Sequence, residues 1–473
     1  MTDSELCFLP ALELARLMRT RAVSAREVTE AHLRQIDRVN PIVNAIITLV
    51  PEMALAAAAR ADEMLARGEP IGPLHGLPIA HKDLAPTKGI RTTYGSPILA
   101  EFVPQQDGII IERLRAAGAI TLGKTNVPEF GAGSQTYNPI FGETLNPYDT
   151  TKTCGGSSGG AAVALACGMM PIADGGDQGG SLRNPASFCN VVGMRPSPGR
   201  VPSWPSFSAW SSLGVEGPMA RTVADTALLL NTLAGPDPRS PISLDDGVRF
   251  DLSLQRDFKG VHIAWSRDLG MLPVDPRVTA VIDSQRGTFA DLGCVVDDAE
   301  PDFQEADEVF KVRRAVNFEV SLGTMFDSQR DKFKETIAWN IEEGRKLTGA
   351  QVARAERMQT ELFHRVRRFM ETYEFLILPV SQVPPFDVSQ RWVTEINGQP
   401  MHTYIDWMKS CYFISAIGNP AISVPCGFTP EGLPIGVQIV GRQRADLEVL
   451  QLAFAFEQAT GFWRQRPGIA GDR

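Results

Sequence analysis

Three short segments of the sequence carry residues that suit nucleophilic catalysis. Lys82 follows a short apolar run, Ser157 lies in Gly155-Gly-Ser-Ser-Gly-Gly160, and Ser181 lies in Asp177-Gln-Gly-Gly-Ser-Leu-Arg183. A serine nucleophile needs a base at neutral pH, and no histidine is well placed for either serine. A lysine can act as that base if burial and neighbouring charges lower its pKa. Together the segments favour a serine nucleophile with a lysine base.

The loop before Ser181 is suited to stabilise negative charge. Gly179 and Gly180 allow the backbone to approach a substrate closely. The successive N–H groups of Gln178, Gly179, Gly180 and Ser181 are predicted to form an anion-binding nest. A nest directed at a tetrahedral intermediate is an oxyanion hole, in which one donor contributes about 3–4 kcal/mol.

The stretch Gly118-Ala-Ile-Thr-Leu-Gly-Lys-Thr125 matches the P-loop pattern of nucleotide-binding proteins. A working P-loop has a strand before it and a helix after it, so that helix N–H groups face the phosphates. Here a helix is predicted before the motif, a strand lies within it, and Pro128 follows. We therefore do not expect nucleotide binding.

The segment around Ser157 also matches GxSxG, the nucleophile elbow of α/β-hydrolases. That elbow needs a preceding strand, whereas residues 142–154 are predicted to form a loop. His262, His364 and His402 fit the required order of partner residues only loosely. A hydrolase that uses Ser157 as its nucleophile therefore stays as an alternative.

Composition excludes several classes of protein. The 473 residues are 43% apolar and 21% charged, with a net charge of -9. These values fit a globular enzyme and argue against nucleic acid or an anionic membrane as a partner. No signal peptide or membrane span is predicted, and seven scattered cysteines without CxxC indicate a reduced, cytoplasmic protein. No metal-binding pattern of histidines and cysteines occurs, so we expect neither a metal nor a cofactor.

The elements that must position these residues alternate between helix and strand. Ser24 and Glu27 form a predicted capping box, and Pro51 begins an Ala-rich helix that Gly68 ends. Further helices are predicted over 108–117, 161–169, 221–234, 303–372 and 446–460, and strands over 76–82, 119–122, 170–173, 261–264, 294–296, 375–379, 420–424 and 435–439.

This alternation predicts an α/β fold with one large domain over residues 1–473. Its central sheet is expected to be twisted, mixed but mostly parallel, and covered by helices on both faces. Residues 1–70 are predicted to form an N-terminal helical segment packed on that domain. Charged helices interrupt the alternation over residues 303–405, which we expect to form a helical insertion or cap over the active site. We expect a monomer or a homodimer.

The sequence resembles the amidase signature family over about residues 10–465. The likeness rests on motifs at 76–83, 92–96, 123–130, 155–160 and 177–186, and continues at 193–196, 217–221, 419–425 and 432–441. The resemblance implies the amidase signature fold, and it explains the false P-loop match.

The resemblance also implies a role for each residue of the catalytic segments. Ser181 would be the nucleophile, Ser157 a bridging serine on a cis peptide bond, and Lys82 the base. Asp177 and Arg183 match a pair that supports the nucleophile loop. Two positions depart from the family pattern, because Gln178 replaces a threonine or aliphatic residue and Gly176 replaces a threonine or serine.

The expected substrate is a small, neutral, hydrophobic amide, anilide or carbamate, because charged residues are sparse around the motifs. Esterase side activity is expected as well. Two further alternatives are the amidase-like subunit of a tRNA-dependent amidotransferase and a catalytically silent binding protein. Candidate substrate-binding residues, mostly loop aromatics, are Tyr94, Gly131, Trp204, Phe207 and Trp210.

Overall fold

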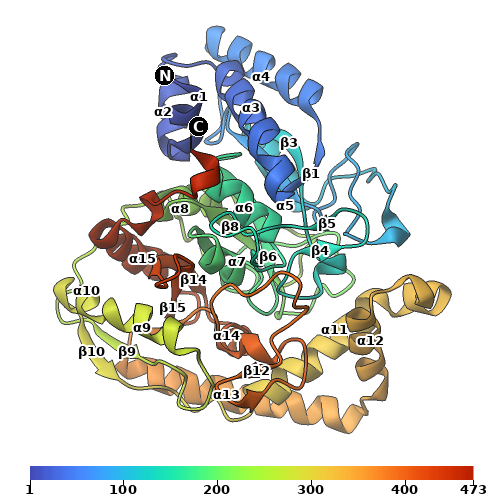
Figure 1. The fold of residues 1–473 in the computed structure, drawn as a ribbon, viewed down its shortest axis with the longest axis vertical. Coiled ribbons are helices and arrows are strands. Elements are labelled where there is room, and N and C mark those ends of the chain that lie inside the picture. The colour runs from blue at the N-terminus through green and yellow to red at the C-terminus, as the bar shows by residue number, and fades with distance from the viewer. Residues whose placement is uncertain (472–473) are drawn as a thin grey trace.

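The computed structural model describes residues 1–471, and an eight-stranded sheet lies at its centre (Figure 1). The strand order is β10-β9-β11-β15-β14-β7-β8-β6. Every residue of β15 is buried, so both faces are covered there. The strands are β6 (Ile172–Asp177), β7 (Val192–Arg195), β8 (Val215–Ala220), β9 (His262–Trp265), β10 (Val295–Asp298), β11 (Phe375–Pro379), β14 (Ala421–Phe428) and β15 (Pro434–Gly441).

The sheet is mixed, as expected, but the prediction that it is mostly parallel is wrong. Only the pairs β10–β9 and β9–β11 are parallel. The other five neighbouring pairs are antiparallel. The reason is that short loops join some strands directly, as residues 429–433 join β14 to β15, and a short loop reverses the chain.

A smaller sheet carries the chain segment that ends in Lys82. Its order is β1 (Ile46–Leu49), β3 (Ile120–Thr125) and β2 (Pro78–Lys82), with β2 parallel to β3. Strand β3 runs through the P-loop-like motif, and helix α5 (Ile109–Ala116) precedes it, as predicted. Lys124 is buried and donates to the carbonyl of Ala85 and the hydroxyl of Thr87. The lysine of this motif is therefore a structural residue.

Four N-terminal helices pack together at one end of the molecule (Figure 1). The predicted capping box of Ser24 and Glu27 begins the third of them, and Pro51 is the first residue of the fourth. One contiguous apolar core extends from Leu6 to Ala470 and includes residues of these helices. The helices are α1 (Asp3–Phe8), α2 (Ala11–Arg19), α3 (Ala25–Val43) and α4 (Pro51–Ala66).

Three helices of the segment 303–405 lie together at another edge of the molecule (Figure 1). They are α11 (Ala306–Gln329), α12 (Glu335–Lys346) and α13 (Gly349–Thr372). Apolar side chains of α11 and α12 form a small second core that includes Ala132. The segment is not purely an insertion, because it also contains β11, a strand inside the central sheet.

The remaining helices pack around the central sheet. Helices α7 and α15 both contact β14 and β15. These helices are α6 (Gly159–Ala166), α7 (Arg183–Phe188), α8 (Val223–Leu233), α9 (Pro276–Ser284), α10 (Arg286–Asp291), α14 (Lys409–Ile417) and α15 (Asp446–Thr460).

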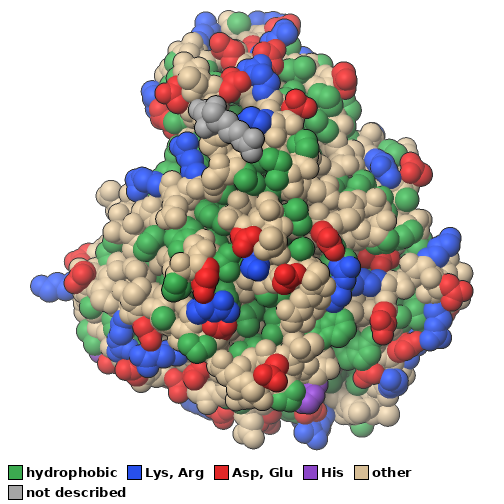
Figure 2. Space-filling model, viewed as in Figure 1, with side chains coloured by type: hydrophobic (Ala, Val, Ile, Leu, Met, Phe, Trp, Pro, Cys, Tyr) green, Lys and Arg blue, Asp and Glu red, His purple; other side chains and the backbone are tan. Residues whose placement is uncertain are grey.

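The surface and the interior differ in character. Acidic and basic side chains are interspersed over the face seen in Figure 2. All seven cysteines are buried and have free thiols. None of the helices within residues 1–471 is long and apolar enough to cross a membrane.

Candidate active site

Lys82 is the last residue of β2, and its side chain ends between two loops. Its ammonium nitrogen donates to the hydroxyls of Ser157 and Ser158, both at 2.8 Å, and to the carbonyl of Gly176 at 3.2 Å. Its backbone N–H donates to Asp174. The side chain is only 3% exposed, so these contacts fix its position.

Burial lowers the pKa of Lys82 to about 7, because the charged form loses its hydration. The carboxylates of Asp177 and Asp174 act in the opposite direction but are weaker. A substantial fraction of Lys82 is therefore neutral at neutral pH. The neutral amine can accept a proton from the hydroxyl of Ser157.

Ser157 lies in the glycine-rich loop just before α6. The Gly156–Ser157 peptide bond is cis. The glycines of this loop allow close packing, because a Cβ at Gly155 would lie 3.0 Å from the Cα of Pro185. The neighbouring Ser158 joins the two serine segments, since its N–H donates to the carbonyl of Ser181 at 3.1 Å.

Asp177 and Arg183 hold the loop that carries Ser181. Two donors of the Arg183 guanidinium bond the two carboxylate oxygens of Asp177 at 2.9 and 3.0 Å. The same carboxylate accepts the N–H groups of Gly180 and Leu182. Arg195 adds a third cationic contact at 3.3 Å. The two arginines together hold the pKa of Asp177 well below its usual range, although burial acts to raise it.

The N–H groups before Ser181 are not all equivalent. Gly180 donates to Asp177, whereas the hydrogen bonds of residues 1–471 include no acceptor for the N–H groups of Gln178, Gly179 or Ser181. Those three donors remain able to bind an anion. Neighbouring side chains leave no room for a side chain at Gly179, where a Cβ would lie 2.9 Å from the ring of Phe310.

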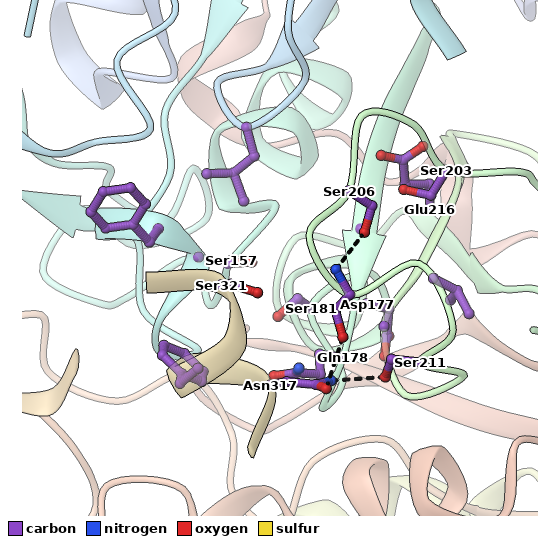
Figure 3. A pocket seen from close by; sticks show the side chains of 18 of the residues that line it. Ser157, Asp177, Gln178, Ser181, Ser203, Ser206, Ser211, Glu216, Asn317 and Ser321 are labelled. Carbon is purple, nitrogen blue, oxygen red and sulfur yellow. Dashed lines mark hydrogen bonds between the residues drawn. The ribbon is translucent and has the colours of Figure 1, made fainter. Parts of the chain in front are cut away.

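A cavity of about 580 Å³ opens over Lys82, Ser157 and Ser181 (Figure 3). One side of it is apolar, with Tyr94 packed against Phe102 and Phe130. Helix α11 contributes Phe318, Leu322 and Met325. The other side carries hydroxyls, and Figure 3 shows the serines of the loop 203–211 on it.

The structure brings some of the expected substrate-binding residues to this cavity and leaves others away from it. Tyr94, Gly131 and Phe207 line it. Trp204 and Trp210 are not among its lining residues, so the structure does not bring them to the cavity. The ring of Trp204 packs on the guanidinium of Arg239 at 4.7 Å, and Trp210 is 79% exposed. Aromatic character alone could not show which way these loop side chains point.

Four residues at the cavity or at Lys82 were not singled out from the sequence. Ser158 and Asp174 hold Lys82 in place. Glu216 and Arg314 are charged and line the cavity, although charged residues were expected to be sparse there. Ser158 could have been found because it is adjacent to Ser157, but Arg314 comes from a distant helix that no motif connects with the site. Residues 1–471 contain no cluster of His, Cys, Asp and Glu that could hold a metal ion.

Comparisons with known proteins identify the family of the chain. The family model described as Amidase matches residues 27–450. An acylamidase of Rhodococcus erythropolis is 35% identical over 471 residues, covering 99% of this chain and 98% of that protein. A glutamyl-tRNA(Gln) amidotransferase subunit of Geobacillus kaustophilus is 36% identical over 482 residues, covering 96% and 98%.

Solved structures show the same likeness. A bacterial aryl acylamidase of the amidase signature enzymes has a TM-score of 0.91 at 28% identity, covering 98% of this chain and 99% of that chain. A 6-aminohexanoate cyclic dimer hydrolase complexed with substrate has a TM-score of 0.89 at 27% identity, covering 98% and 100%. The resemblance drawn from the motifs is therefore confirmed, and the chain belongs to the amidase signature family of hydrolases that act on C–N bonds.

Proposed function

We propose that the chain hydrolyses hydrophobic amides, anilides or carbamates through an acyl-enzyme on Ser181, with side activity on esters. The observation that supports this most directly is the 2.8 Å contact between Lys82 and Ser157 beneath a cavity that also reaches Ser181. A buried lysine with a lowered pKa beside a hydroxyl is an activated base.

The proposed reaction begins with neutral Lys82, which takes the proton of Ser157 while Ser157 takes the proton of Ser181. The Ser181 oxygen attacks the substrate carbonyl carbon, and the carbonyl electron pair moves onto the oxygen. The N–H groups of Gln178, Gly179 and Ser181 stabilise that oxyanion. Gly180 is better assigned to loop support, because its N–H already binds Asp177.

The C–N bond then breaks as Ser157 delivers the proton to the leaving nitrogen and recovers one from Lys82. An ester on Ser181 remains. Water then attacks its carbonyl carbon while Ser157 and neutral Lys82 take the water proton, the C–O bond to Ser181 breaks, and that proton returns to the Ser181 oxygen. The hydrogen bonds of residues 1–471 do not include one between Ser157 and Ser181. Rotation of the Ser181 side chain on substrate binding would close that step, as catalytic hydrogen bonds often tighten in the bound state.

Two alternatives make different predictions. An amidotransferase subunit is favoured by relatives such as the Geobacillus protein, but such a subunit would depend on partner proteins. A hydrolase with Ser157 as nucleophile would need a histidine, whereas Ser157 contacts Lys82 here. The buried thiols support the expected reducing, cytoplasmic setting.

The deciding experiment uses the purified single chain with 4-nitroacetanilide, a matched aryl ester and a matched carbamate. We expect hydrolysis without any partner protein, and labelling by a fluorophosphonate at Ser181, located by peptide mass mapping. Ser181→Ala should lower kcat by about 10⁴-fold or more with unchanged melting. Exposed Glu52→Gln serves as the control. Labelling at Ser157 would support the alternative nucleophile, and an inactive, unlabelled chain would contradict the proposal.

A further inference from the structure

One charged side chain that lines the cavity has no hydrogen-bond or ion-pair partner within residues 1–471. Glu216 lies in β8, and residues 1–471 supply no hydrogen bond or ion pair to its carboxyl group. The other acidic group of the cavity, Asp177, binds two arginines. Arg314 donates to Gln178, Asn340 and Tyr404. Among these lining charges of the described chain, Glu216 is the one left for a ligand.

The sheet register directs Glu216 toward the reacting groups. Glu216 is paired with Gly176 of β6, and directly opposed residues of an antiparallel pair share one face. A Cβ on Gly176 would lie 3.9 Å from the Lys82 nitrogen, so this face looks toward Lys82. Because Gly176 has no side chain, space remains above it. Glu216 and Ser203 both line the cavity (Figure 3).

The electrostatics around Glu216 are consistent with a carboxyl group that lacks a hydrogen-bond donor. Burial raises the pKa of Glu216 to about 8, repulsion from Asp174 adds to the rise, and Lys82 opposes it. A carboxylate that is partly desolvated and has no donor is costly. A ligand that brings an N–H donor or a positive charge would remove that cost.

We propose that Glu216 recognises a basic, N–H-donating nitrogen of the substrate, so that the preferred substrates are hydrophobic amides that carry an ammonium group. The aromatic side of the cavity would hold the apolar body of such a molecule, and Ser203 and Ser206 line the same cavity as Glu216. This inference rests on the proposed function and names its substrate class.

The test compares substrates that differ only in a methyl or an ammonium group. One pair varies the acyl side, hexanoyl-4-nitroanilide against 5-aminopentanoyl-4-nitroanilide. A second pair varies the leaving group, 4-ethylacetanilide against 4-(aminomethyl)acetanilide. Kinetics are measured at about pH 8.5, where Glu216 is mostly ionised and an alkylamine of pKa about 10 is still charged.

We expect the wild type to prefer the ammonium member of at least one pair by about 10-fold or more in kcat/KM, as charge-assisted hydrogen bonds commonly give. Glu216→Gln, which keeps the shape, should remove that preference through KM. The loss of kcat/KM should fall on the ammonium member relative to the methyl member of each pair. Exposed Glu52→Gln should change neither.

Two results would overturn the inference. One is a wild type that shows no ammonium preference with either pair. The other is a Glu216→Gln variant that slows both members of each pair alike, which would mean that the residue acts on Lys82 or on folding.

Binding to Ser181→Ala, measured by calorimetry with 4-(aminomethyl)acetanilide, separates this inference from the proposed function. Tight binding that Glu216→Gln weakens, in a chain that hydrolyses no anilide, would support the inference and contradict the function. Hydrolysis without ammonium preference would do the reverse.

Discussion

Lys82 must be neutral to act as a base, and its burial determines the pH at which it loses its proton. Since burial lowers its pKa to about 7, the neutral fraction grows as the pH rises through 7 and is nearly complete one unit higher. We therefore expect kcat/KM for a neutral anilide to rise through this range and then level off. Lys82→Arg should be inactive at every pH, because guanidinium does not lose its proton. Substantial activity in Lys82→Arg would exclude the lysine base.

The same burial destabilises the fold. The folded pKa of Lys82 is depressed from 10.5 to about 7, so the unfolded chain binds the proton more tightly. Stability is therefore lost as the pH falls from 10.5 toward 7, with a loss of about 4 kcal/mol at pH 7. The three hydrogen bonds of the ammonium offset part of this, at about 1 kcal/mol each.

Lys82→Met should thus be inactive but more stable than the wild type by about 1 kcal/mol at pH 7. The gain should shrink or reverse at pH 10, where the lysine is mostly neutral in the folded state and the cost of its burial is nearly gone. Denaturant unfolding at the two pH values measures this. Equal stability differences at both pH values would show that Lys82 is not desolvated as the structure indicates.

At the residue scale, a motif can identify a catalytic residue when the residues next to it in the sequence form a recognisable pattern. Lys82, Ser157 and Ser181 could be found because glycines and serines at fixed spacing accompany them. Glu216 could not, because its access to the cavity depends on its pairing with Gly176 across the sheet. The sequence could not show that Trp204 and Trp210 lie outside the lining of the cavity, because side-chain direction in a loop leaves no sequence pattern.

Helix α11 directly contacts the loop 178–181, whose N–H groups are proposed to bind the oxyanion. The segment 303–405 therefore has a part in the site. Arg314 donates to the side chain of Gln178, and Phe310, about one turn earlier, packs where a Cβ of Gly179 would lie. Asn317 bonds Ser208 and Ser211 on the facing loop (Figure 3). The helix thereby connects the two loops that border the cavity.

We expect Gln178→Ala to lower kcat by about 10-fold with little change in KM, because the loop donors would be less well positioned for the transition state. Arg314→Met should have a similar effect on kcat, and the double variant should be no worse than the worse single variant. Fully additive losses in this cycle would show that Arg314 does not act through Gln178.

Elements were predicted more reliably than their directions. The helices beginning at Ala25 and Pro51 and the strand Phe375–Pro379 follow from caps and short apolar runs. The antiparallel pairing of β14 and β15 depends on the five-residue loop between them. The alternation of helix and strand in the sequence does not show the turn geometry of such a loop. For this reason the predicted α/β class was right, whereas the prediction that most strand pairs are parallel was wrong.

At the scale of the whole molecule, one carboxylate of the central domain contacts the N-terminal helices, which also share the apolar core with that domain. Helix α2 has no side-chain cap of its own, and Asp225 of α8 accepts the N–H groups of Ala11 and Leu12 at its start. A carboxylate at this position also suits the positive end of a helix dipole. Asp225 thus caps a helix whose first residue, Ala11, lies 214 positions earlier in the chain.

Asp225→Ala should lower the free energy of unfolding by about 1–3 kcal/mol, because the buried N–H of Ala11 and the partly buried N–H of Leu12 lose their acceptor. Limited proteolysis should then cut within residues 1–43 sooner than in the wild type. Exposed Asp245→Ala is the matched control. A variant with unchanged melting and cleavage would mean that these helices attach through apolar packing alone.

The buried thiols have a practical consequence for observing the cavity. Burial raises the pKa of Cys7, Cys154 and Cys411 to about 12, and the thiolate is the reactive form. The native chain should therefore resist maleimide dyes. Phe207, 85% exposed at the rim of the cavity, is the natural place for one added cysteine. Phe207→Cys should take up a single fluorophore per chain by intact mass, and its emission would then report molecules entering and leaving in real time.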